Sequence, residues 1–211
     1  MKDRQKQVAL FAREYLDGLK RVVDRVDVCQ IAELIGELQR AYDDDRHIFI
    51  IGNGGSAGTA SHMACDLAKN VLGKLPDKTK KRFRVMSMTD NVPMITALSN
   101  DLGFEHVFTE QLHLFARRGD LLLVISGSGN SPNLIRAIEL AREMGLRTAG
   151  LLGFNGGKAL PLLDTTVLVP DFTYGYVEDL HMVFDHLITA WFCRQFHVPE
   201  RVRRVPKSKK K

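Results

Sequence analysis

Apolar residues in the first part of the chain recur at three- and four-residue steps, which is the spacing of one face of an α-helix. One series runs from Val8 to Val23 and a second from Ile31 to Tyr42, with the stretch from Asp24 to Asp27 between them. The pattern predicts two amphipathic helices ahead of the main sheet, as a helical N-terminal extension. Their apolar faces need a partner surface, and a second subunit is one candidate.

After this extension the pattern changes to short apolar runs, each followed by a turn and a helical stretch. Strands are predicted at 47–51, 83–88, 121–126, 147–153 and 165–170. Near-continuous apolar strands alternating with helices are typical of a parallel sheet covered on both faces. We therefore expect a doubly wound, flavodoxin-like α/β fold with five parallel strands. In such sheets ligands bind at the carboxyl ends of the strands where the winding reverses, which directs attention to the loops after the first and third strands.

Composition and charge support one folded domain with a short tail. Hydrophobic residues at 45% and charged residues at 26% are ordinary for a globular protein. We expect a single domain over 1–199, with helices in 1–43 and an α/β core in 44–199, followed by a disordered basic tail over 200–211. The tail carries seven positive groups and one negative group, so without it the net charge of +5 becomes −1. A nucleic-acid-binding function would rest on this tail alone and is not expected.

The sequence also predicts a cytoplasmic protein. No apolar stretch approaches the roughly 20 residues that a membrane-spanning helix needs, and no signal-like apolar stretch follows the start MKDRQKQ. The three cysteines are an odd number at wide spacings, which argues against a disulfide framework and a zinc ribbon. We expect reduced thiols at Cys29, Cys65 and Cys193.

Two glycine-rich loops occupy the places where a ligand is expected. Residues 52–56 read Gly-Asn-Gly-Gly-Ser, and residues 126–131 read Ser-Gly-Ser-Gly-Asn-Ser. Each lies between a strand and the N-terminus of a helix, where backbone N–H groups and hydroxyls can bind an anion. Glycines in either loop alone could merely turn the chain, but both together favour a phosphate site. A dinucleotide motif fits poorly because Ala57 takes the third glycine position, and no Gly-Lys-Ser/Thr follows for a P-loop. A phosphomonoester held by serines fits better.

Two predicted helices carry ionisable side chains suited to chemistry. His62 and Asp66 are four residues apart on the helix that begins at the first loop, so they share one face. The last helix places five ionisable groups within nine residues of otherwise apolar sequence: Glu178, Asp179, His181, Asp185 and His186. A single histidine on such a helix is more often a core or surface residue. The grouping on both helices indicates a functional site.

The paired motifs GNGGSA and ISGSGNSPN, each opening a helix, resemble the SIS (sugar isomerase) family. The chain is similar in particular to its sedoheptulose 7-phosphate isomerase (phosphoheptose isomerase) branch, over about residues 40–195. The resemblance implies that the substrate phosphate is held by Ser126, Gly127, Ser128 and Ser131. It implies that the sugar is contacted by Asn53, Gly54, Gly55 and Ser56, by Glu178, and by Asp90 or Asn91. Relatives often have Ser-Thr-Ser where this chain has Ser-Gly-Ser at 126–128.

By the same resemblance, the protein converts sedoheptulose 7-phosphate to D-glycero-D-manno-heptose 7-phosphate. Proton transfer between neighbouring carbons through an enediol needs a base and an acid, which the resemblance assigns to Asp66 and His186. It implies one zinc ion per site, and zinc suits this set of nitrogen and oxygen ligands: His62, Asp66, Glu178 and His186. Relatives usually carry glutamate in place of Asp66 and glutamine in place of Glu178, which affects reach and charge.

The resemblance further implies a homotetramer with active sites between subunits. An alternative is a non-catalytic SIS protein that senses a phosphosugar or associates with the replication initiator. Retention of both Asp66 and His186 favours the enzyme.

Overall fold

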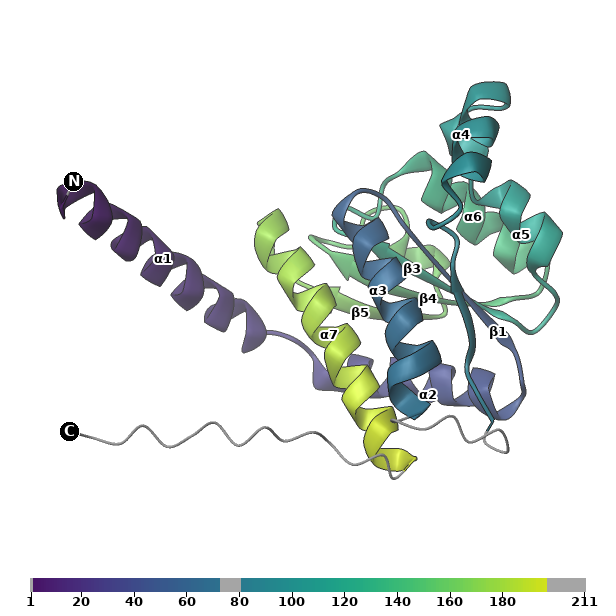
Figure 1. The fold of residues 1–211 in the computed structure, drawn as a ribbon, viewed down its shortest axis with the longest axis horizontal. Coiled ribbons are helices and arrows are strands. Elements are labelled where there is room, and N and C mark those ends of the chain that lie inside the picture. The colour runs from purple at the N-terminus through teal and green to yellow at the C-terminus, as the bar shows by residue number, and fades with distance from the viewer. Residues whose placement is uncertain (1, 73–80, 197–211) are drawn as a thin grey trace.

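A computed structural model describes residues 2–72 and 81–196 of the chain (Figure 1). The predicted basic tail at 200–211, and the predicted end of the domain at 199, lie outside these residues. The elements in chain order are α1 (Lys2–Val23), α2 (Val28–Asp43), β1 (His47–Gly52), α3 (Gly55–Lys69), η1 (Asn70–Leu72), β2 (Arg84–Ser87), α4 (Val92–Asp101), η2 (Phe104–His106), α5 (Thr109–Phe115), β3 (Leu121–Ser126), α6 (Pro132–Glu143), β4 (Arg147–Gly153), η3 (Leu160–Leu162), β5 (Thr165–Val169) and α7 (Tyr174–Gln195).

The five strands form one parallel sheet in the order β2-β1-β3-β4-β5, as predicted. The winding reverses between β1 and β3, which are neighbours in the sheet. Gly52 at the end of β1 pairs with Ile125 near the end of β3. The loops that follow these two strands therefore start side by side at the carboxyl edge of the sheet.

Helices cover both faces of the sheet (Figure 1). Ile48 and Ile50 of β1 pack into a hydrophobic layer with α2, α3 and α7. Phe49 and Ile51 point the other way, into a layer with α5 and α6. Because both faces are buried, both sets of alternating side chains must be apolar, and this explains the near-continuous apolar runs in the sequence. α3 and α7 lie side by side on one face.

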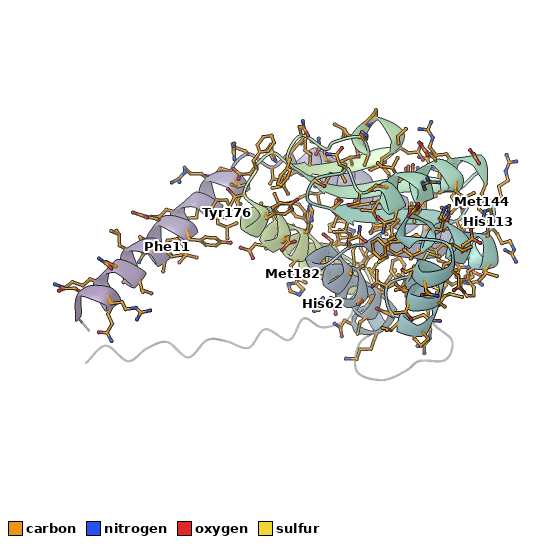
Figure 2. The ribbon with its side chains drawn as sticks, turned by 90° about the horizontal axis from the view of Figure 1, so that it is seen from above. Phe11, His62, His113, Met144, Tyr176 and Met182 are labelled. Atoms are coloured by element: carbon orange, nitrogen blue, oxygen red, sulfur yellow. The ribbon has the colours of Figure 1, made fainter. Side chains whose placement is uncertain are left out.

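The helix α1 projects from the body and contacts it through its C-terminal half (Figures 1 and 2). The Tyr15 hydroxyl donates a 2.8 Å hydrogen bond to Asp179 of α7. The ring centroids of Tyr15 and Tyr176 are 4.8 Å apart. This hydrogen bond raises the pKa of Tyr15 to about 12. Figure 2 shows Tyr176 near this junction and Phe11 farther out along the helix. Several large apolar side chains of α1 are exposed: Val8, Leu10, Phe11, Leu16 and Val23.

In the described part of the chain, no helix is both long enough and apolar enough to cross a membrane.

Candidate active site

The first glycine-rich loop links β1 to α3 and lies against α7. Gly54 precedes the first residue of α3 and has a φ of 56°, a left-handed conformation that glycine adopts without strain. The carboxylate of Glu178 lies over Gly55, where a Cβ atom would come within 3.0 Å of both its oxygens. A negative group at this point complements the partial positive charge of the helix N-terminus. Glu178 therefore lies at the first loop.

The second loop links β3 to α6 and keeps its hydroxyl protons available. Ser126 Oγ accepts a 3.0 Å hydrogen bond from the Gly129 amide, and Ser128 Oγ accepts one of 3.3 Å from Asn130. Each hydroxyl can still donate its own proton to an anion. Ser131 precedes the first residue of α6, and its side chain makes no capping hydrogen bond.

The loop that follows β4 holds the second loop in place. Gly129 has a φ of 64°, and a Cβ atom there would lie 2.1 Å from the Gly156 carbonyl oxygen. The amide of Ala159 donates to the Gly129 carbonyl at 3.0 Å, and the amide of Lys158 donates to Asn130 Oδ1 at the same distance. Only glycine fits at position 129 without moving the neighbouring backbone.

A pair of asparagines joins the first and second loops. The side-chain amides of Asn53 and Asn133 exchange two hydrogen bonds of 2.9 Å each. Asn133 is 2% exposed and lies in the first turn of α6. The sequence predicted Asn53 as a substrate contact but missed Asn133. Much of the hydrogen-bonding capacity of Asn53 is thus used to fix the distance between the two loops.

The turn after β2 lies on a different side of α3. Asp90 and Asn91 line a pocket of about 510 Å³ together with Ser61 and Cys65. The Ser61 hydroxyl donates to the Asp90 carboxylate, and Asn91 Oδ1 accepts a 3.1 Å hydrogen bond from the Met94 amide. Both candidate substrate contacts therefore also stabilise this turn.

The facing sides of α3 and α7 bring four ionisable side chains together. One potential ligand atom from each lies within 4.8 Å of the others, and the residues are His62, Asp66, Asp185 and His186. Nδ1 of His62 is 2.7 Å from Asp185 Oδ2 and 3.9 Å from Asp66 Oδ2. The rings of His62 and His186 pack edge to face, with their centroids 5.1 Å apart. Both histidines are exposed, whereas both acids are buried.

This cluster contains three of the four residues predicted as metal ligands. Glu178 lies outside it, and Asp185 lies within it. From the sequence, Asp185 was one of the ionisable groups of the last helix, and no role was predicted for it. It falls on the buried stripe of α7 with Phe184 and Ile188. A carboxylate on an apolar stripe is the signal that could have indicated a partner across the helix interface.

Burial and hydrogen bonding perturb the titration of two members of the cluster. The hydrogen bond to Asp185 raises the pKa of His62, although partial burial opposes the shift. Burial raises the pKa of Asp185, and its hydrogen bond with His62 opposes this. The pair therefore holds a proton more firmly than either group would in water.

The donor types of the cluster fit a zinc ion. Imidazole nitrogens and carboxylate oxygens are common zinc ligands, and a catalytic site typically has three protein ligands and one position for water or substrate. His62, Asp66 and His186 supply such a set, and the exposed histidines leave it accessible. The arrangement can also transfer protons, because it combines a buried carboxylate with exposed imidazoles.

Comparisons with known proteins identify the family of the chain. Residues 12–153 match the family described as SIS domain. Phosphoheptose isomerase from Pelobacter propionicus is 35% identical over 158 residues, which are 75% of this chain and 81% of that protein. Phosphoheptose isomerase from Chlorobaculum parvum is 33% identical over 186 residues, 88% of each chain. The solved structure of phosphoheptose isomerase GmhA from Neisseria gonorrhoeae has a TM-score of 0.78 and 28% identity, covering 89% of this chain and 97% of that one. The chain thus belongs to the SIS domain family, on the branch of the phosphoheptose isomerases.

Proposed function

We propose that this protein is a sugar-phosphate isomerase that converts sedoheptulose 7-phosphate to D-glycero-D-manno-heptose 7-phosphate. The observation that carries the proposal is that two glycine-rich loops lie at the switch point of the sheet, and that the helix opened by the first loop shares a His/Asp cluster with α7. Membership of the phosphoheptose isomerase branch supports the same substrate class.

The phosphate is expected at the N-terminus of α6. Ser126, Ser128 and Ser131 belong to the loop that leads into this helix, and the first turn of α6 contains no acidic residue. The N-terminus of α3, in contrast, already faces the carboxylate of Glu178. A dianion therefore meets less repulsion at the second loop. The sugar chain would then extend toward Asn53, Ser56 and Glu178.

Asp66 is the proposed base and His186 the proposed acid. Asp66 is 8% exposed, and Asn70 donates a hydrogen bond to its Oδ1, which leaves Oδ2 for proton transfer. His186 is exposed and can exchange its proton with substrate and solvent. Zinc held by His62, Asp66 and His186 would polarise the substrate carbonyl. Glu178, predicted from the sequence as a fourth ligand, is better placed to contact the sugar.

We further propose a cytoplasmic homotetramer in which a second subunit covers each site. The exposed histidines of the cluster and the uncovered apolar face of α1 support this arrangement. A water-excluding cover would strengthen the electrostatic contacts of the site.

A coupled assay with a panel of sugar phosphates, led by sedoheptulose 7-phosphate, tests the proposal. It is run on the protein as purified, after chelation and after zinc is restored. Asp66→Asn and His186→Ala are expected to lower kcat by about 100-fold or more, because general acid–base catalysis typically contributes that much. His113→Ala on α5 and Glu143→Gln on α6 replace an exposed histidine and an exposed acid on helices that cover the opposite face of the sheet from α3 and α7, and they serve as controls.

Full activity in both site variants would overturn the residue assignment. An intact fold that binds phosphosugars but turns over none of them would instead indicate a non-catalytic binding protein.

A further inference from the structure

Asp185 is a buried carboxylate directly beneath an exposed histidine. Its relative exposure is 0%, the lowest of the four cluster residues, whereas the side chain of His62 is 44% exposed. Asp185 Oδ2 lies 2.7 Å from His62 Nδ1, and Asp185 Oδ1 lies 3.5 Å from the hydroxyl of Thr189, one turn along α7. Both carboxylate oxygens thus face protein groups.

The distance between Asp185 and His62 distinguishes a shared proton from a shared metal ion. Zinc–ligand bonds of about 2.0–2.1 Å place two tetrahedral ligand atoms about 3.3 Å apart. A separation of 2.7 Å is shorter than this and matches a charge-assisted hydrogen bond. With Asp185 ionised, its oxygens only accept hydrogen bonds, and Nδ1 of His62 is the donor. The lone pair of the neutral ring is then on Nε2.

Asp66 does not compete for this proton. Its Oδ2 is 3.9 Å from His62 Nδ1, beyond hydrogen-bond distance, and its Oδ1 accepts from Asn70. Each acid of the cluster therefore has its own hydrogen-bonding partner. Asp185 is hydrogen-bonded to His62, and Asp66 is hydrogen-bonded to Asn70.

We propose that Asp185 is a positioning residue that fixes the Nδ1–H tautomer of His62 and presents Nε2 to the metal ion or the substrate. The inference deepens the proposed function and rests on it for the role of Nε2. A carboxylate behind a metal-binding histidine fixes ring orientation and raises ligand basicity, and loss of such a partner typically costs 10- to 100-fold in metal affinity. The place of Asp185 on the apolar stripe of α7 also has an explanation, because His62 is the partner that permits its burial.

Nitrogen-15 NMR of the metal-free wild-type protein tests the tautomer directly. At a pH where the ring of His62 is neutral, its long-range correlations are expected to report a protonated Nδ1. A protonated Nε2 would overturn the proposal, and this measurement requires no variant to fold. This measurement of the tautomer does not depend on whether the protein turns over a sugar phosphate.

Asp185→Asn gives the second test, with circular dichroism to verify the fold. The amide can donate to Nδ1, which favours the opposite tautomer, so we expect a shifted tautomer population and zinc affinity lowered 10- to 100-fold in competition with a chromophoric chelator. Asp179→Asn makes the same change on the same helix, outside the cluster, and should alter neither readout. An unchanged tautomer and unchanged zinc affinity in a folded Asp185→Asn protein would overturn the proposal.

The two proposals can fail separately. A wild-type protein with the Nδ1–H tautomer that turns over no sugar phosphate would refute the isomerase and leave the role of Asp185 intact. Turnover of a sugar phosphate by a wild-type protein with the Nε2–H tautomer would support the isomerase and refute the role of Asp185.

Discussion

His181 is a buried histidine whose ring has no hydrogen-bond partner among the described residues. Burial lowers its pKa from 6.5 to about 4. The backbone of Leu152 is close enough to oppose the shift, but neither ring nitrogen reaches hydrogen-bonding geometry. The unfolded chain therefore binds a proton near pH 6.5, whereas the folded chain binds it only near pH 4. Stability is at its full value above pH 6.5 and falls by about 3 kcal/mol as the pH drops to 4.

His181→Leu should remove this pH dependence. Leucine adds no titratable group and leaves no unpaired polar atom, so we expect equal or higher stability at pH 7 and a growing advantage toward pH 5. Urea unfolding at several pH values measures the difference. His113→Gln, which removes an exposed histidine, should retain the wild-type slope. Parallel pH profiles for His181→Leu and the wild type would contradict the argument.

At this scale, spacing within one helix predicts which residues share a face. That argument found His62 and Asp66, and the grouping of ionisable residues marked His186. The same grouping included Asp185, but spacing could not pair Asp185 with His62 or Asn133 with Asn53, because these partners lie far away in sequence. Long-range packing decides which buried polar groups meet, and helical or strand periodicity carries no information about it.

At the scale of elements, the packing around the second loop explains why this chain has Ser-Gly-Ser at 126–128, where relatives often have Ser-Thr-Ser. A Cβ atom at Gly127 would lie 2.9 Å from Cε1 of Tyr174, so the tyrosine ring occupies the space of a larger side chain. Tyr174 packs edge to face on Phe154 with ring centroids 4.8 Å apart. Threonine at position 127 would displace Tyr174 and lose this aromatic contact, at a cost of about 1 kcal/mol.

A double-mutant cycle tests this interpretation. Gly127→Thr alone should destabilise the protein by about 1 kcal/mol, whereas the same change made together with Tyr174→Ala should cost much less. Urea unfolding of the four proteins gives the coupling energy, and KM for the sugar phosphate shows whether the added hydroxyl improves binding. Additive free energies would mean that Tyr174 does not restrict position 127.

The strands were predictable because their apolar runs are short and bounded by turns. β1 begins at His47, as predicted, and β3 coincides with the predicted range. β2 is shorter than predicted, at Arg84–Ser87, because it lies at the sheet edge and pairs only with β1. Edge strands have fewer hydrogen-bonding partners to define their ends.

At the scale of the whole molecule, topology rules carried the prediction further than composition did. The switch-point rule directed attention to the loops after the first and third strands, and the structure places these strands side by side in the sheet. What a second copy contributes could not be predicted, since one sequence gives apolar faces without their partners. α1 is the clearest case, because several of its large apolar side chains are exposed in the single chain.

The exposed stripe of α1 gives the last prediction. Phe11 is 68% exposed and lies on the same helical face as Val8 and Tyr15. If other subunits cover this face, Phe11→Glu places a charge in an apolar interface and should dissociate the assembly. Sedimentation should then report a smaller species, with lower isomerase activity, because the proposal places each site between subunits. Arg13→Glu puts the same side chain on the polar face of α1 and should leave the assembly intact. A wild-type protein that is fully active as a monomer would refute the shared site, whereas a stable, active Phe11→Glu tetramer would move the interface to another surface.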